Sequence, residues 1–146
     1  MFVENFISDN RIYAIILYAN YKREGIHFFT PNDFSHQLGY INRPKGYLIP
    51  PHIHNSVSRE VFFTNEVLFI KSGKVRVDFY NENKKYLESR ILKQGDVILL
   101  AAGGHGFEML EASEIIEVKQ GPYVGEFDKT RIDMIEKNKF IIKNFQ

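Results

Sequence analysis

Three histidines and one glutamate stand at spacings that suit a metal site. Two of them, His52 and His54, alternate in the segment Pro50-Pro51-His52-Ile53-His54. In extended backbone, side chains at positions i and i+2 point to the same face, about 6.5–7 Å apart along the strand. The two prolines disfavour a helix interior. Two imidazoles that converge from one strand form a recurring half of a transition-metal site. The alternative is a pair of solvated histidines in a loop.

Glu66 and His105 are the other two candidates. Glu66 opens the apolar run Glu66–Lys71, which ends at the turn Ser72-Gly73. A buried carboxylate needs a partner such as a metal or a protonated histidine, whereas a glutamate at a strand end can also remain in water. His105 follows the run Val97–Leu100 and a pair of glycines, so the turn can aim its imidazole inward. Taken alone, His105 is more typical of a structural histidine.

The composition excludes several other functions. The 146 residues include no Cys, which excludes a disulfide framework, a cysteine zinc site and a thiol nucleophile. The formal net charge of +1 provides no basic field for nucleic acid. No apolar run approaches the roughly 20 residues of a membrane helix, and the N-terminus lacks signal-peptide features. A soluble, cytoplasmic protein with one domain over residues 1–146 is expected.

Short β-strands are predicted to position these residues. The chain is rich in aromatic residues, with 13 Phe and 8 Tyr, which favours β structure. Alternation and turn signals predict strands at Arg11–Tyr18, Ile26–Phe29, Gln37–Asn42, Tyr47–Ile49, Glu66–Lys71, Lys74–Tyr80, Tyr86–Leu92, Val97–Leu100, Phe107–Leu110 and Glu114–Gln120. Such short, regular strands indicate an all-β sandwich or barrel. The segment Lys129–Lys143 fits neither a helical nor a strand period, and its structure is left open.

Together, these spacings resemble the two sequence motifs of the cupin superfamily. The first motif, G(x)5HxH(x)3–4E(x)6G, is matched by Gly46, His52, His54, Glu66 and Gly73, although eleven residues separate His54 from Glu66. The second motif, G(x)5PxG(x)2H(x)3N, is matched by Gly95, Gly103 and His105, with Ala101 in place of Pro, His105 one residue early and Met109 near the place of Asn. The resemblance covers about residues 46–107.

The resemblance implies a double-stranded β-helix, or jelly-roll barrel, over about residues 11–120, with a tail over residues 121–146. It also implies a mononuclear divalent metal (Fe, Mn, Ni, Zn, Co or Cu) that acts on a small polar molecule. The ligands carried over from the motifs are His52, His54, Glu66 and His105. The insertion Asn55–Asn65 either forms a lid or pulls Glu66 out of register.

Two other functions stay open. A metal-free isomerase or epimerase of sugars or nucleotide sugars would use His52 or His54 as the base and Tyr40, Tyr47 or Tyr123 as the acid. A non-enzymatic module would only bind a small ligand. The residues do not decide between an oxygenase and an isomerase. The chain contains no nucleophile elbow, P-loop or dinucleotide-binding glycine motif, which disfavours phosphoryl transfer and nicotinamide chemistry.

Some charged residues have two interpretations. Glu117 and Lys119 share one side of the strand Glu114–Gln120 and would form an inward acid–base pair if that side faced the interior. Ile116 and Val118 provide an apolar inward side instead, which favours a surface position for the charged pair. Arg76 and Arg90 are expected on solvated faces. Because exposed sheet edges invite pairing, a homodimer is expected, with Arg11–Tyr18 as the candidate edge.

Overall fold

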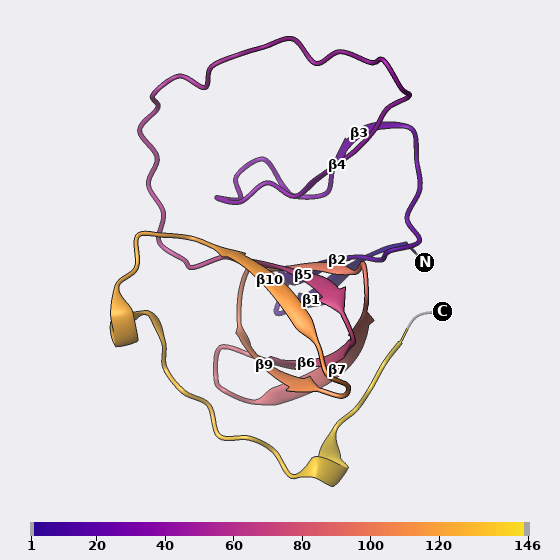
Figure 1. The fold of residues 1–146 in the computed structure, drawn as a ribbon. Helices are drawn as coiled ribbons and strands as arrows, with labels where there is room; N and C mark the ends of the chain where they lie inside the picture. The colour runs from indigo at the N-terminus through magenta and orange to yellow at the C-terminus, as the bar shows by residue number, and fades with distance from the viewer. Residues whose placement is uncertain (1, 145–146) are drawn as a thin grey trace. The chain divides into compact units, whose positions relative to one another are not determined.

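The computed structural model describes residues 2–144 and confirms an all-β chain. This part of the chain contains ten β-strands and two short 3-10 helices, and no α-helix (Figure 1). None of the described helices is long and apolar enough to cross a membrane. The strands belong to two compact units, of which the larger combines residues up to Tyr21 with those from Phe63 onward and the smaller is Lys22–Phe62. The single domain over residues 1–146 stays a prediction.

The larger unit contains two antiparallel sheets. The five-stranded sheet has the order β1 (Val3–Ser8), β2 (Arg11–Leu17), β8 (Val97–Leu100), β5 (Glu66–Ser72), β10 (Glu114–Lys119). The three-stranded sheet has the order β7 (Tyr86–Lys93), β6 (Lys74–Tyr80), β9 (Gly104–Met109). The strands predicted at Glu66–Lys71, Lys74–Tyr80, Tyr86–Leu92 and Val97–Leu100 are confirmed to within one residue.

The core of this unit is built by alternate residues of both sheets. On β6, the side chains of Val75, Val77 and Phe79 are buried in one cluster with Leu68 and Ile70 of β5. Phe6 of β1 stacks on Phe79 with ring centroids 4.2 Å apart, so the aromatic pair links the two sheets. Full burial of one such side chain contributes about 1.5–3 kcal/mol, which makes this cluster the main source of stability.

The strand β1 is absent from the sequence-based prediction, which starts the barrel at residue 11. Glu4 takes an inward position on β1 and interrupts the apolar alternation that would have signalled a strand. The turn to β2 uses Asp9 and Asn10, both at positive φ, as in tight two-residue hairpins. Because β2 pairs with β1 on one side and β8 on the other, the assignment of Arg11–Tyr18 as a sheet edge is wrong.

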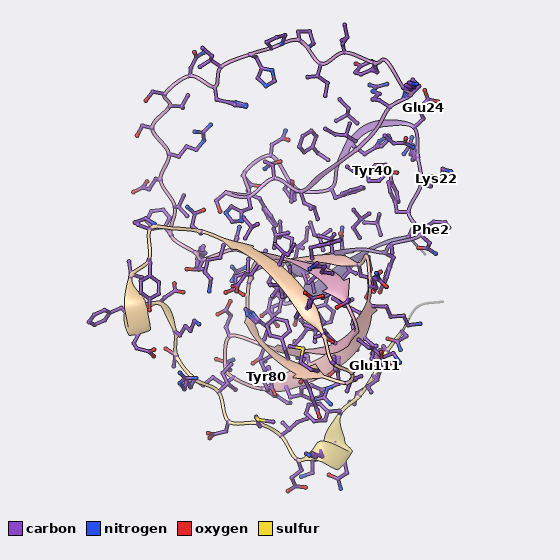
Figure 2. The ribbon with its side chains drawn as sticks, viewed as in Figure 1. Phe2, Lys22, Glu24, Tyr40, Tyr80 and Glu111 are labelled. Carbon is purple, nitrogen blue, oxygen red and sulfur yellow. The ribbon has the colours of Figure 1, made fainter. Side chains whose placement is uncertain are left out.

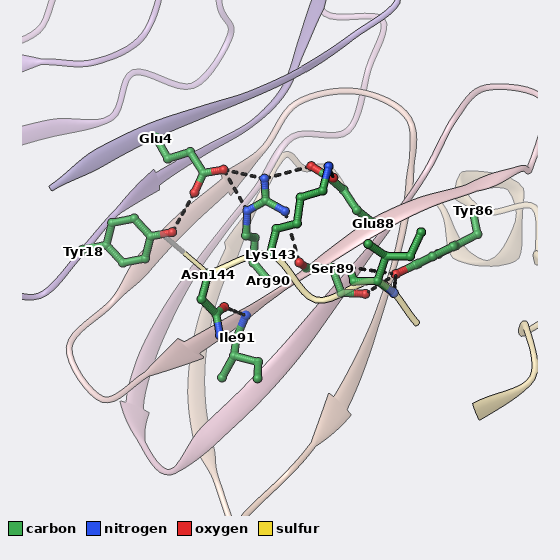
Figure 3. Close-up of polar contacts among 10 residues, drawn as sticks. Glu4, Tyr18, Tyr86, Glu88, Ser89, Arg90, Ile91, Lys143 and Asn144 are labelled. Atoms are coloured by element: carbon green, nitrogen blue, oxygen red, sulfur yellow. Dashed lines mark hydrogen bonds and ion pairs between the residues drawn. The ribbon is translucent and has the colours of Figure 1, made fainter. Parts of the chain in front are cut away.

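The expectation that Arg76 and Arg90 lie on solvated faces is also wrong. Both are buried, with 7% and 2% of their surface exposed. Arg90 donates to Glu4 and to Glu88, as Figure 3 shows, and Arg76 forms two hydrogen bonds to Asp78. The guanidinium groups are buried because carboxylates compensate their charge: one on the same strand in each case, and one on another strand, Glu108 of β9 for Arg76 and Glu4 of β1 for Arg90. The contribution from the other strand cannot be read from alternation within one strand.

The C-terminal segment covers the outer edge of β7. Two 3-10 turns, η1 (Gly125–Asp128) and η2 (Lys137–Lys139), interrupt it, and it contains no strand among the described residues. The amide of Ser89 donates to the carbonyl of Ile141, and the amide of Lys143 donates to the carbonyl of Ser89. The ring of Phe140 lies 3.6 Å from the guanidinium carbon of Arg76. Residues 145 and 146 of the expected tail lie outside the described residues.

The smaller unit contains one two-stranded antiparallel sheet. Its strands are β3 (Gly25–Phe28) and β4 (Gly39–Asn42). The segment from residue 43 to residue 62 contains no regular strand, so the strand predicted at Tyr47–Ile49 is wrong. The prolines at positions 50 and 51 directly after it lack the amide hydrogens that a sheet ladder needs.

Candidate functional site

Glu66 occupies an inward position at the start of β5. The period of two places it on the same face as Leu68 and Ile70, both of which are buried in the core. Its own exposure is 8%, so the carboxylate is largely withdrawn from water. A buried carboxylate is tolerated only when a partner compensates its charge.

His105 approaches Glu66 from the other sheet. It lies on β9 directly opposite Phe79 of β6, whose buried side chain marks the inner face. The glycine turn before β9 positions His105, as the sequence predicts. Gly103 has a φ of +68°, and Gly104 lies opposite Tyr80 of β6, which Figure 2 labels. The imidazole retains 28% exposure, so it stays accessible to a small molecule.

The site is a chain of four charged or polar side chains. His105 Nε2 lies 3.0 Å from Glu66 Oε2, and Lys119 Nζ lies 3.2 Å from Glu66 Oε1. Lys119 Nζ also lies 3.0 Å from Oε1 of Glu117. The register of β5 with β10 produces this grouping, because it places Lys119 opposite Glu66 and Glu117 opposite Leu68.

The assignment of Ile116 and Val118 to the inward side of β10 is wrong. These two side chains are 51% and 59% exposed, and the alternate side, with Glu117 and Lys119, faces Glu66. The apolar pair stays outside because β10 is the last strand of its sheet and its outer face is solvated. The sequence names Lys119 only as a possible partner of Glu117, and its contact with Glu66 is not predicted, since strand register depends on residues far apart in the chain.

The electrostatics of the site follow from these contacts. The hydrogen bond from His105 is the main cause that lowers the pKa of Glu66, to about 2, while burial opposes the shift and Lys119 reinforces it. Hydrogen bonds to Glu117 and Glu66 raise the pKa of Lys119. At neutral pH, Glu66 is therefore a carboxylate and Lys119 an ammonium.

Acid is expected to weaken the metal-free protein through Glu66. The folded-state pKa of about 2 lies below the ordinary value of 4.5, so the stabilisation is present above pH 4.5 and is lost as the pH falls towards 2. The shift corresponds to roughly 3 kcal/mol. The difference in unfolding free energy between wild type and Glu66→Gln, measured by urea denaturation, should shrink over this range. Glu126→Gln, whose side chain is 86% exposed, is the control. A difference that stays constant down to pH 2 would contradict the expectation.

The candidate ligands His52 and His54 form a second pair in the smaller unit. Their ring centroids lie 5.1 Å apart, and they lie in irregular chain instead of the extended strand of the prediction. The Nδ1 atom of His52 lies 2.9 Å from the carbonyl oxygen of Pro50, which leaves Nε2 as its ligand atom. The four candidates are thus found as two pairs. Within residues 2–144, no three His, Asp or Glu side chains gather at metal-binding distances.

The tyrosines considered as acids belong to other segments of the chain than β5, β9 and β10, which carry the Glu66 cluster. Tyr40 and Tyr47 belong to the smaller unit, where the guanidinium of Arg43 lies 4.6 Å from the Tyr47 ring centroid. Tyr123 follows β10 and is 92% exposed. None of the hydrogen bonds or ion pairs of Glu66 and His105 described above involves a tyrosine.

The fold and the site define an all-β protein with a carboxylate–imidazole pair on the inner face of two sheets. Protein-family models, curated proteins and solved structures provide no match for this chain.

Proposed function

We propose that the chain is an enzyme for a small polar molecule and that Glu66 and His105 are two ligands of a divalent transition metal. The distance of 3.0 Å between Glu66 Oε2 and His105 Nε2 carries the proposal. Two ligand atoms at about 2.1 Å from one metal, at right angles to each other, lie about 3.0 Å apart. The pair is thus spaced as neighbouring ligands are.

The donor set fits a transition metal at this position. Imidazole nitrogen and carboxylate oxygen suit Fe, Mn, Ni, Co, Cu and Zn, and their softness does not choose among these metals. Lys119 Nζ lies 3.2 Å from Oε1 of Glu66, whereas His105 Nε2 lies 3.0 Å from Oε2. A ligating carboxylate whose second oxygen accepts a hydrogen bond is typical of metal sites. His52 and His54 are proposed as the remaining ligands, on the resemblance to cupins.

The jelly-roll barrel belongs to the same proposal. Eight strands of the larger unit divide into antiparallel sheets of five and three, and the inner faces of both contribute to one core. A bound metal would supply Lewis-acid chemistry to a substrate oxygen. Lys119 would hold a negatively charged or carbonyl group of the substrate, because its side chain is 34% exposed and its ammonium lies beside Glu66.

A second candidate is a metal-free sugar isomerase or epimerase that uses the same pair. Since Nε2 of His105 donates to Glu66, a neutral imidazole presents the lone pair of Nδ1 as a base. The buried carboxylate orients the ring and stabilises the imidazolium that forms. The hydrogen bond thus makes His105, instead of His52 or His54, the base in this version.

Metal content tests the first candidate. Protein prepared without a metal-binding tag, and dialysed against each of the six metals in turn, should retain near-stoichiometric metal. Glu66→Gln and His105→Gln should lose it while circular dichroism shows an intact fold, because each removes a ligand. His36→Gln, a histidine outside the proposed site, is the matched control. No metal in the wild type, or undiminished metal in both ligand variants, would overturn the metal proposal.

Solvent proton exchange tests the second candidate. With a chelator present, deuterium from the solvent should enter keto-sugar nucleotides at the carbon beside the carbonyl, and His105→Gln should abolish this exchange. A protein that shows neither metal nor exchange would contradict both enzyme candidates. Saturable binding of an unmodified sugar nucleotide would then identify a binding module.

A further inference from the structure

One edge of β1 has no backbone partner among residues 2–144. β1 is the outermost strand of the five-stranded sheet, and β2 covers its other edge. The amide of Tyr18 donates to the carbonyl of Phe2, so alternation directs the backbone groups of Glu4 and Phe6 towards β2 as well. The backbone groups of Val3, Asn5 and Ile7 therefore point to the free edge. Such an edge is a template for a further strand.

This edge lacks the charged and proline side chains that usually block pairing, and the one bulge in its pairing adds a residue, Tyr13, to β2 and leaves the alternation of β1 intact. The strand Val3–Ser8 contains no Lys, Arg or Pro, and its one charged side chain, Glu4, is turned inward to Arg90 and Tyr18 (Figure 3). The opposite end of the same sheet, β10, carries three charged side chains over Glu114–Lys119. The edge of β7 in the other sheet is covered by the C-terminal segment.

We propose that this edge of β1 binds β1 of a second copy of the chain, antiparallel, with a two-fold axis at Asn5. In this register Val3 lies opposite Ile7 of the second copy, and Asn5 lies opposite Asn5. All three have outward-directed backbone groups, so each pair exchanges both backbone hydrogen bonds. Apolar pairs flank a central amide pair, and no like charges meet. The strand is thus complementary to itself, as a two-fold interface requires.

A groove along β1 provides room for the second strand. It has a volume of about 440 Å³ and is lined by Val3, Glu4, Asn5, Phe6, Ile7, Glu88 and Arg90. Ile7 is 58% exposed at its rim, and Phe2 just before β1 is 52% exposed. Pairing would cover these apolar side chains and join the two five-stranded sheets into one continuous sheet. The interface is independent of the reaction proposed for Glu66 and His105.

Thiol cross-linking tests the register directly. The chain contains no Cys, so Asn5→Cys introduces a single thiol on the proposed axis. Hydrogen-bonded antiparallel pairs have Cα atoms about 5.5 Å apart and Cβ atoms at the wide end of about 4.5–5.5 Å, so a short bismaleimide joins the two thiols without the strain of a direct disulfide. Treatment with the bismaleimide should convert Asn5→Cys into a covalent dimer. Val118→Cys, 59% exposed on β10 at the other end of the sheet, is the matched control and should stay monomeric on a non-reducing gel. Equal cross-linking of both variants, or none of Asn5→Cys, would overturn the proposal.

Sedimentation velocity tests the interface without a cross-link. The wild-type chain should sediment as a dimer. Asn5→Lys should raise the dimer dissociation constant by more than about tenfold, because two ammonium groups then meet on the axis. Val118→Lys should leave the dimer unchanged, and circular dichroism verifies that both variants fold. A monomeric wild type at every concentration, or a dimer that Val118→Lys disrupts and Asn5→Lys does not, would contradict the β1 interface.

Discussion

Replacing Gly103 with alanine is expected to destabilise the protein by about 2–4 kcal/mol and to displace His105 from Glu66. Gly103 has a φ of +68°, where a residue with a Cβ atom costs roughly 1–2 kcal/mol. An added Cβ would also lie 2.4 Å from the ring of Tyr13 and 2.6 Å from the carbonyl oxygen of Tyr80. Tyr13 is fully buried, so its ring has little room to move. The strain falls on the turn that precedes His105.

Urea denaturation measures the stability change, and the imidazole NMR signals of His105 report its position. Gly106→Ala, on β9 directly after His105, is the matched control. An added Cβ there meets only the ring of Tyr80, at 4.0 Å, and the backbone has no positive φ. This control should change the unfolding free energy by no more than about 1 kcal/mol. If Gly103→Ala proved as stable as Gly106→Ala, with unchanged His105 signals, the structural role of Gly103 would be refuted.

Replacing Arg90 with alanine is expected to cost about 3–5 kcal/mol of stability, because it leaves a buried carboxylate without its cation. Glu4 has 5% of its surface exposed, and its Oε1 lies 2.7 Å from Nη2 of Arg90. The hydroxyl of Tyr18 would remain as the main donor to Glu4. Figure 3 shows the network, which extends from Arg90 to Glu88 and links β1 with β7.

A double-mutant cycle measured by thermal and urea unfolding separates this charge effect from lost packing. The double variant Glu4→Leu/Arg90→Met should recover most of the lost stability, since apolar side chains can replace a buried ion pair at little cost. Lys71→Ala removes an ion pair to Glu114 between two side chains that are more than half exposed, and should cost less than about 1 kcal/mol. Costs at Glu4 and Arg90 that simply add would show that the two side chains do not act as a pair.

The sequence by itself determined the β class, most strand positions and two of the residues that meet in the site. Strand boundaries such as Lys74–Tyr80 are readable because the alternation of apolar and polar residue types, and the turns between strands, are local properties of the chain. Local position alone leaves Glu66 and His105 open to other interpretations, and the resemblance to the cupin motifs is what names both as candidates. The glycine turn before His105 also predicts that its imidazole is aimed inward.

Only the tertiary structure decided which residues surround that pair and which strand forms the sheet edge. Lys119 meets Glu66 because β5 and β10 pair in one register, although 52 residues lie between Glu66 and Lys119 in the sequence. Arg90 is buried because Glu4, from the other end of the chain, supplies a charge. The strand β1 was not predicted because Glu4 interrupts its apolar pattern. The hydrogen-bond donors to Glu4, Tyr18 and Arg90, lie far from it in the sequence. In each case a long-range partner offsets the cost of burying a polar group, and no local pattern encodes that partner.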